Sequence, residues 1–565
     1  MNSLLLAIVC FIAYVVAYNT YGRYLADKIF KLDRECRTPA HELRDNIDYV
    51  PASKPVLFGH HFTSIAGLGP IVGPAIAVIW GWVPAVLWVV FGSIFMGAVH
   101  DFGSLVLSMR AGGRSIGDIT ADLINPRVRT LFMIIIFLEL WLVIAVFALI
   151  IALLFDMHPQ SVISIWSEVP IAIWLGWMVY KKGYSPVKTG IVAVILLYIT
   201  IIIGAYNPLS LPTIGPLSPV MLWMIILFVI NSFITSTLPV HVLLQPRDYI
   251  NAQELFIILI LIGIGTVVGH PEIVAPPIAA SPAGAPAMWP FLFVIIACGA
   301  ISGFHSLVSS GTSAKQIDCE KDAQLISYGG MLMEGGLSIL VIVAVTAGIG
   351  MKYVGGDGTI FTGAEAFNAH YASWQAASGL TSKINAFIIG SANLLESYKI
   401  PYEIGITIMG VFLVSFAATT LDTATRLQRY IISEFSAAHN VKFFQNRYAA
   451  TTVAVVTAAG LAFYDGSGKG ALKLWPLFGT VNQLLAALAL LLLTVYFVRN
   501  KKPVLISLLP FLFMVVMTGW AMLLNIGQYF SEGNWLLFVI GLIVFVLEIW
   551  MIIESVVVLK KLKAS

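Results

Sequence analysis

Residues 59–74 have the sequence GHHFTSIAGLGPIVGP, and this stretch decides the fold. Two prolines and three glycines fall within residues 67–74 of an otherwise apolar segment. Proline removes a backbone donor and clashes with the preceding turn, so it interrupts a helix. At membrane depth, freed backbone groups are tolerated only against protein, water or a ligand. The stretch therefore predicts a broken membrane helix at a binding site, and close helix packing through small residues is the alternative.

The composition of the whole chain is that of an integral membrane protein. Its 565 residues are 59% hydrophobic and 11% charged, with a mean hydropathy of +0.91. Soluble domains carry about 25% charged residues, so a soluble enzyme is excluded. At about 20 residues per crossing, the length allows about 12–16 helices. The net charge of +3 gives no reason to expect a nucleic-acid partner, and the four cysteines have neither metal-thiolate nor disulfide spacing.

Hydropathy predicts fifteen membrane spans and no separate soluble domain. The predicted spans are 3–22, 59–79, 81–108, 130–155, 168–180, 188–205, 219–244, 252–270, 290–313, 325–350, 401–424, 449–463, 474–497, 503–524 and 535–559. A shorter apolar stretch at 384–396 predicts a surface or re-entrant helix.

The distribution of Lys and Arg predicts the orientation of these spans. The first apolar segment is followed, not preceded, by positive charges and has no cleavage site, which indicates a retained helix with its N-terminus outside. With this threading, 27 of the 32 Lys and Arg residues fall on the cytoplasmic side. The outside loops 206–218 and 271–289 contain none. The C-terminus is then cytoplasmic.

A second break is predicted at residues 231–240, NSFITSTLPV, which are polar in the seventh span and then meet proline. A Ser/Thr-rich packing face with a simple kink is the alternative. The two breaks lie five spans apart, in spans of opposite direction, as a five-plus-five inverted repeat requires. This predicts an all-α polytopic membrane protein divided into a first helix and loop (1–56), a first repeat (57–206), a second repeat (207–425) and additional C-terminal helices (426–565). The residues expected to bind substrate at the two breaks are Ser64, Gly67, Gly69, Asn231, Ser232 and Thr235.

Ionisable side chains within spans are costly and indicate function. His60, His61, His100 and Asp101 lie at similar depths near the cytoplasmic ends of the second and third spans, so we expect them to meet as a proton relay or inner gate. A metal site there is the weaker alternative, since the histidines lack helical i, i+4 spacing.

Further acidic residues lie in the predicted spans. Glu334 has no basic neighbour in sequence and is the best candidate proton carrier. Asp422 has Arg426 one helical turn later, which predicts an ion pair between them. Glu139 also lies in mid-span, and Glu548 lies in the peripheral C-terminal part, where a structural role is expected.

The helical spacing of three serines in the ninth span predicts a cation site on one face of the helix. Ser306, Ser309 and Ser310 are related by i, i+3 and i+4 and share one side of a helix. Converging hydroxyl groups can hold a small cation or a carboxylate, and interhelical hydrogen bonding is the alternative.

Six segments carry a family resemblance. They are FGHHFTSIAG (58–67), GAVHDF (97–102), LQPRDY (244–249), ISGFHSLVSSGT (301–312), TTLDTATRLQRY (419–430) and LWPLFG (474–479). Through them, residues 1 to about 500 resemble the carbon starvation protein A (CstA) family, of which this chain looks like a short member.

The resemblance implies a transporter of the cytoplasmic membrane, made under nutrient limitation, that takes up peptides or pyruvate. It also implies the amino acid–polyamine–organocation architecture with a five-plus-five core. In sodium-coupled proteins of that architecture a cation lies between the first and eighth core helices, which here would place it between Ser306, Ser309 and Ser310 and the carbonyls near Ala66 and Gly69. The family also contains proton-coupled members.

Together these observations predict a symporter that imports peptides or pyruvate, with protons favoured over sodium as the coupling ion. We expect a multi-pass protein of the inner membrane that uses no cofactor or metal. A membrane-embedded metal-dependent enzyme using His60, His61, His100 and Asp101 is the first alternative. A starvation sensor acting through the cytoplasmic loops is the second.

Overall fold

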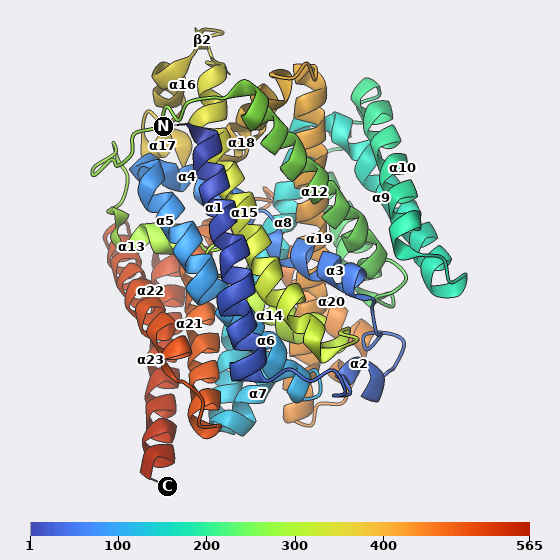
Figure 1. Ribbon diagram of the computed structural model, residues 1–565, viewed down its shortest axis with the longest axis vertical. Helices are drawn as coiled ribbons and strands as arrows, with labels where there is room; N and C mark the ends of the chain where they lie inside the picture. The colour runs from blue at the N-terminus through green and yellow to red at the C-terminus, as the bar shows by residue number, and fades with distance from the viewer. Residues whose placement is uncertain (1, 565) are drawn as a thin grey trace.

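The structure is a computed structural model that describes residues 2–564. Helices make up 78% of it, and the only strands among these residues are the two short, antiparallel strands β1 (Tyr353–Val354) and β2 (Ile360–Phe361). Figure 1 shows the helices running in a common direction, with the N-terminus at one end and the C-terminus at the other.

The first half of the chain contains ten α-helices and several tighter or wider helical turns. The α-helices are α1 (Ser3–Ala17), α2 (Pro39–Glu42), α3 (Lys54–Ala66), α4 (Gly69–Ala77), α5 (Trp82–Gly92), α6 (Ala98–Arg110), α7 (Ile116–Leu123), α8 (Pro126–Met157), α9 (Val162–Gly176) and α10 (Pro186–Tyr206).

The second half continues the same all-helical pattern. Its α-helices are α11 (Pro219–Ile226), α12 (Leu244–Gly269), α13 (Met288–Ile295), α14 (Gly303–Gly311), α15 (Gly330–Val343), α16 (Gly363–His370), α17 (Trp374–Ala377), α18 (Leu380–Glu396), α19 (Tyr402–Ala438), α20 (Arg447–Phe463), α21 (Trp475–Arg499), α22 (Leu505–Ser531) and α23 (Trp535–Ala564). Helix α11 extends through the π-helix η7 (Leu227–Thr235).

Local sequence explains where several of these helices begin. Asn125 and Ser218 cap α8 and α11 by accepting the backbone N–H groups of Val128 and Met221, and each is followed by proline at the first helical position. Such a proline loses no helical hydrogen bond and has its φ already set for a helix.

Within residues 2–564, eleven helices are long and apolar enough to cross a membrane, or twelve if the bent pair α3–α4 is one span. The predicted stretches that do not form single long helices are this pair, the shorter apolar helices Pro219–Thr235 and Arg447–Phe463, and the separate helices α13 and α14. The apolar stretch predicted near 384–396 lies in α18.

Two predicted spans are corrected in detail. The seventh was expected to continue to residue 244 through a break, but its helix ends at Thr235 and α12 begins at Leu244 after a turn, so Pro239 terminates a helix instead of bending one. The ninth was expected to be continuous, but it is interrupted over residues 296–302 between α13 and α14. The second helix break therefore lies in the ninth predicted span.

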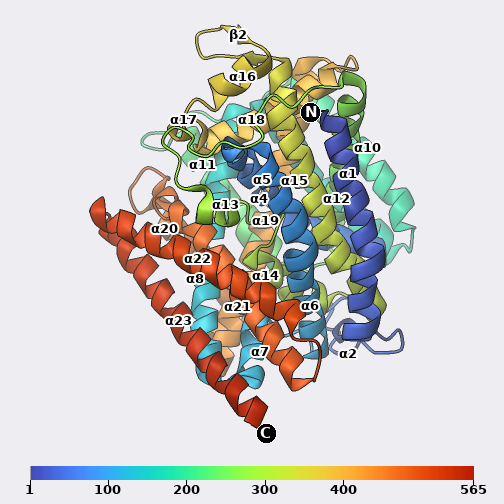
Figure 2. The ribbon, with the colours of Figure 1, turned by 60° about the vertical axis from the view of Figure 1, so that its left-hand side comes forward.

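The packing distinguishes a core from its periphery. In the most apolar 18-residue stretch of α19, 89% of the residues are buried, against 28% in the corresponding stretch of α23. Helices α8 and α19 pack along each other at the centre, α4 packs on α15, and α14 packs on α6. Helices α9 and α10 lie at one edge of the molecule, and α22 and α23 lie at the opposite edge (Figures 1 and 2).

Candidate functional site

A cavity of about 840 Å³ reaches the centre of the helical core. Its inner wall is made by Gly67, Gly69, Cys298 and Thr420, which come from both helix breaks and from α19. Its lining also includes Gly284 and Ala285 of the loop 271–289 and Trp374 of α17, a helix that lies near the N-terminus in Figure 1. The cavity therefore extends from that end of the molecule to the two breaks.

The first break is confirmed where the sequence predicts it. Helix α3 ends at Ala66, α4 begins at Gly69, and the two are bent by 41°. A Cβ atom on Gly67 would lie 2.7 Å from Thr420 Oγ1, and one on Gly69 would overlap the side chain of Cys298. Glycine is required at both positions because α19 and the second break approach the backbone so closely.

Ser64 lies one turn before this break and outside the cavity lining. Its Oγ is 3.3 Å from Thr423 Oγ1 and 3.5 Å from His60 Nδ1. Of the three residues expected to bind substrate at the first break, Gly67 and Gly69 line the cavity. Ser64 does not line it and contacts His60 and Thr423 instead.

The second break, residues 296–302, is held open by side chains from three other helices. Trp88 Nε1 donates to the carbonyl of Ile296 at 2.9 Å, and the N–H of Gly299 donates to Glu334 Oε1 at 3.1 Å. Asn482 Oδ1 accepts the N–H of Phe304 at 2.9 Å. Three backbone groups in and next to the break are therefore satisfied by side chains of the protein.

A continuous row of buried acid and imidazole groups starts at this break. His305 Nε2 faces Glu334 Oε2 at 3.3 Å, an ion-pair distance without the alignment of a hydrogen bond, and His305 Nδ1 lies 3.1 Å from Asp101 Oδ2. Asp101 Oδ1 lies 2.7 Å from His100 Nδ1. We call Glu334, His305, Asp101 and His100 the relay. Each is at most 1% exposed, and both ring nitrogens of His305 face carboxylate oxygens, an arrangement that a doubly protonated ring satisfies.

Ligand atoms of Cys298, His305 and Glu334 lie within 4.8 Å of one another, the one such group of three found among the described residues. A thiolate, an imidazole and a carboxylate suit a borderline cation such as Zn²⁺. Because His305 and Glu334 already face each other at 3.3 Å, a proton is the cation that this geometry holds without rearrangement.

The four residues expected to meet at one cytoplasmic gate make different hydrogen bonds. His100 and Asp101 join the relay, whereas His60 Nδ1 lies 2.5 Å from Asp248 Oδ2 and His61 Nδ1 lies 2.8 Å from Ser313 Oγ. The expected cluster is therefore divided, because His60 and His61 are consecutive on a helix and bond to different neighbours, although His61 stays close enough to Asp101 to interact electrostatically with it. Sequence reasoning missed His305 and Asp248 as partners, although both lie inside the family motifs.

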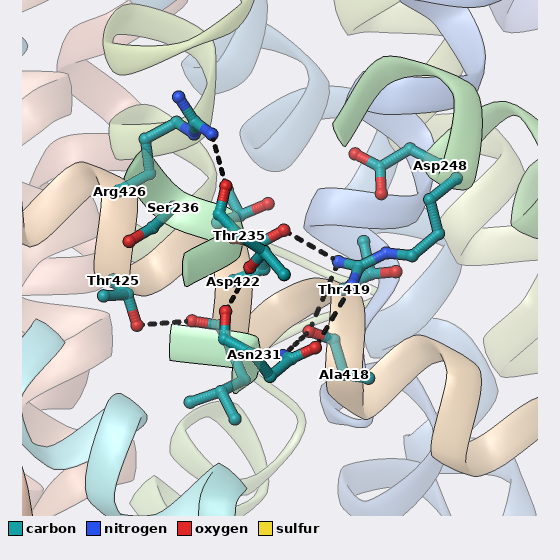
Figure 3. Close-up of polar contacts among 12 residues, drawn as sticks. Asn231, Thr235, Ser236, Asp248, Ala418, Thr419, Asp422, Thr425 and Arg426 are labelled. Atoms are coloured by element: carbon teal, nitrogen blue, oxygen red, sulfur yellow. Dashed lines mark hydrogen bonds and ion pairs between the residues drawn. The ribbon is translucent and has the colours of Figure 1, made fainter. Parts of the chain in front are cut away.

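A second polar network joins η7, α12 and α19 (Figure 3). Arg247 Nη2 donates to Asp422 Oδ2 at 3.0 Å, and Arg247 Nη1 donates to Asn231 Oδ1 at 3.3 Å. Asn231 Nδ2 donates to the carbonyl of Ala418 at 3.0 Å. The predicted ion pair between Asp422 and Arg426 is wrong, because Arg426 instead donates to the carbonyls of Thr235 and Leu238 at the end of η7.

Asn231, Ser232 and Thr235, the remaining residues expected to bind substrate, lie in or beside this network and do not line the cavity. The Thr235 hydroxyl donates to the carbonyl of Asn231, and Ser232 is fully buried.

The predicted serine face is buried on α14. Ser306 Oγ donates to the carbonyl of Gly303 and Ser310 Oγ to that of Ser306, both at 2.7 Å. Ser310 Oγ also accepts the N–H of Ile116 at 3.0 Å, and Ser309 Oγ has no partner among the described residues. Two of the three hydroxyl groups are therefore used within the protein.

The end of the core opposite the cavity is closed by Asp48 from the loop that follows α2. Asp48 Oδ1 accepts from Arg426 Nη1 at 3.0 Å, and both of its oxygens accept from Arg429 Nη2 at 2.7 and 2.8 Å. Burial alone would raise the pKa of the Asp48 carboxyl, but Arg429 and Arg426 outweigh it and hold that pKa well below its usual range. We call this contact the inner clamp.

Comparison with known proteins identifies the family. The sequence profile described as "Carbon starvation protein CstA" matches residues 2–521. The pyruvate/proton symporter BtsT of Escherichia coli (strain K12) is 32% identical, over 90% of this chain and 80% of that protein. The peptide transporter CstA of Campylobacter jejuni is 31% identical, over 94% of this chain and 81% of that protein.

A solved structure shares the fold. A mutant of the manganese transporter of Eremococcus coleocola superposes with a TM-score of 0.50 at 11% sequence identity, covering 92% of this chain and 99% of that one. The curated relatives are named as transporters, so the alternative of a membrane enzyme is rejected. The chain belongs to the carbon starvation protein CstA family and is a multi-pass membrane transporter.

Proposed function

We propose that this protein is a proton-coupled symporter that imports pyruvate or short peptides across the cytoplasmic membrane during carbon starvation. The observation that carries the proposal is the relay, which begins at the second helix break beside the cavity and continues through His305 to Asp101 and His100. Related proteins named as a pyruvate/proton symporter and as peptide transporters support the same substrates and ion.

The cavity supports binding of a small carboxylate. Helix α4 begins at Gly69 on the cavity wall, so the positive end of its dipole faces the space where substrate would lie. Pyruvate and peptides both carry a carboxylate, the group that helix N-termini favour. The apolar residues Val143, Phe147 and Phe304 on the same wall suit the rest of such a ligand.

Glu334 links proton binding to the shape of the second break. Its carboxylate accepts the N–H of Gly299 and faces His305, so a proton on Glu334 would weaken both interactions at once. The break and the relay would then change together, and a proton bound from the cavity side would shift the population between the two access states.

The proposed core has five-plus-five helices within fifteen crossings, and paired packing supports it. Helix α4 packs on α15 as α14 packs on α6, and α7 packs on α8 as α18 packs on α19. This pairing relates the bent pair α3–α4 to the interrupted pair α13–α14, and α8 to α19. It favours a boundary between the repeats in the loop 271–287, with α9 and α10 inserted in the first repeat.

The test is pyruvate and dipeptide uptake into proteoliposomes under imposed pH or sodium gradients. We expect Glu334→Gln to abolish uptake driven by the pH gradient while substrate exchange survives, because Gln cannot carry the proton. Glu548→Gln is the matched control, since Glu548 is also buried in a membrane helix but lies on the peripheral α23. Uptake that follows a sodium gradient and ignores the pH gradient would overturn the proton assignment.

A further inference from the structure

Two glutamates from different helices share a buried site that the relay does not include. Glu168 on α9 is 2% exposed and Glu254 on α12 is fully buried. Ser415 on α19 lies between them, with its Oγ 3.5 Å from Glu168 Oε2 and its side chain also beside Glu254. The two carboxyl groups are close enough to interact with each other.

The site contains oxygens without partners. Both carboxyl oxygens of Glu254 and Oε1 of Glu168 have no hydrogen-bond partner among the described residues, and neither glutamate belongs to an ion pair there. Two bare carboxylates in such a setting are very costly. We therefore expect either a bound cation beside the two carboxyl groups or a proton on one of them.

An amide oxygen provides an independent sign of a ligand. Asn251 is fully buried beside Glu168, one turn before Glu254 on the same face of α12. Its Nδ2 donates to Thr419 Oγ1 at 2.8 Å, which fixes the orientation of the amide and leaves Oδ1 without a partner. A buried amide oxygen without a partner beside the Glu168 carboxyl can accept a hydrogen bond from the protonated form of that carboxyl.

This site lies at one end of a row of polar side chains between α12 and α19, which we call the polar ladder. Asp248, Asn251 and Glu254 follow at i, i+3 and i+6 on α12, while Ser415, Thr419 and Asp422 follow at i, i+4 and i+7 on α19. Contacts across the ladder join Asn251 to Thr419 and Arg247 to Asp422, and His60 joins it at Asp248. The ladder leads from His60 on α3 to the glutamate pair, whereas the relay lies on α6, α14 and α15.

We infer that Glu168, Glu254, Asn251 and Ser415 form a second cation site, which holds one proton on its pair of carboxyl groups. The charged or titratable groups that face it are Arg247 and Asp248 from α12 and Tyr198 from α10. A single proton leaves the pair with one negative charge, and the positive charge of Arg247 lies close enough to compensate part of it. In its transport consequence the inference rests on the proposed symport, to which it adds a second proton per cycle.

The direct test needs no transport. Infrared difference spectra of the purified full-length protein, titrated with acid in the absence of substrate, should show the carbonyl band of a protonated carboxylic acid that is lost in both Glu168→Gln and Glu254→Gln. Glu548→Gln controls for removal of a buried carboxyl elsewhere. Spectra of both variants that keep every such band of the wild type would overturn the inference, and so would stoichiometric binding of ²²Na⁺ by the wild type that Glu254→Gln abolishes.

The transport test separates this inference from the proposed function. Reversal potentials for pyruvate in proteoliposomes should give one proton fewer per pyruvate in Glu254→Gln than in the wild type, with uptake still coupled to pH through Glu334. An unchanged ratio in a variant that has lost the infrared band would overturn the second coupled proton. If the chain moves no pyruvate at all, the infrared result still decides whether the pair holds a proton.

Discussion

At the scale of single residues, Gly69 is where the two helix breaks touch. It begins α4 on the wall of the cavity, and the side chain of Cys298 from the second break lies directly against its backbone. Neither break can shift without the other responding, because there is no space between them. A glycine at this position therefore serves both the shape of the cavity and the contact that links the breaks.

We expect Gly69→Ala to lower substrate uptake by about tenfold or more, while protein in the membrane stays near the wild-type amount. The added methyl group would overlap Cys298, and overpacking of this kind costs about 1–3 kcal/mol. Gly263→Ala is the matched control, because a Cβ there meets no atom within 4 Å. Uptake rates in proteoliposomes, normalised to protein, make the measurement. Equal rates for both variants would show that the two breaks do not need this contact.

At the scale of elements, the long helix α19 connects the cavity with the opposite end of the core. Thr420 lines the cavity wall, Asp422 holds Arg247, and Arg426 and Arg429 hold Asp48 in the inner clamp. Because these residues share one rigid helix, opening at one end is mechanically linked to closure at the other. The structure combines a cavity that reaches Thr420 with an Asp48 that is bound to both arginines.

We expect Asp48→Asn to shift the population toward the inward-open state. The variant removes the negative partner of two almost fully buried arginines, and a shift of about tenfold in the equilibrium needs only about 1.4 kcal/mol. Cytoplasmic labelling of a cysteine placed at Thr237, near the clamp, should increase by about that factor. Glu35→Gln, in the exposed segment that precedes α2, is the control and should leave the labelling unchanged.

The pKa of Asp48 also determines what the clamp does with pH. The pKa of Asp48 is lowered in the closed state, so its carboxylate stabilises that state at any pH above the ordinary Asp pKa of about 3.9. The stabilisation is lost only as the pH falls toward the lowered pKa. Between about pH 5 and 8 the clamp is therefore constant. The pH profile of uptake should keep its shape in Asp48→Asn, and a profile flattened by this substitution would transfer the pH response from the relay to the clamp.

At the scale of the whole molecule, the two ends of the chain lie at opposite ends of the helical bundle (Figures 1 and 2). Ser3 Oγ donates to the carbonyl of Pro271 at 2.6 Å, so the N-terminus lies beside the loop 271–289. Helices α2 and α7 lie at the other end, near the C-terminus (Figures 1 and 2). The Lys and Arg residues concentrate toward that second end, which predicts that it faces the cytoplasm.

Labelling of single cysteines tests this orientation. Cys36 and Ser281 are both exposed, one near α2 and the other in the loop 271–289. With the other cysteines replaced, Cys36 should react with an impermeant thiol reagent only after permeabilisation, and Ser281→Cys in a chain without Cys36 should react in intact cells. The reverse pattern would invert the whole threading, including the side on which the cavity opens.

The amino-acid sequence alone determined the class of protein, the family and the first helix break. Apolar stretches of membrane length are a property of the local sequence, and the glycines and prolines of residues 67–74 disrupt a helix whatever surrounds them. Glu334 could be selected from sequence for a similar reason, because a carboxyl without a basic neighbour in an apolar segment is costly wherever the chain places it.

Only the tertiary structure decided the second break and the partners of the buried charges. Residues 296–302 contain no proline, and they unwind because Trp88 and Glu334 satisfy backbone groups of Ile296 and Gly299, while Asn482 bonds the Ser302 hydroxyl and the first turn of α14. Arg426 does not pair with the nearby Asp422, because Asp48 and the carbonyls of Thr235 and Leu238 provide it with three acceptors. Backbone and charged groups in a membrane protein take the partners that lie closest in space, and the distance along the chain does not specify which those are.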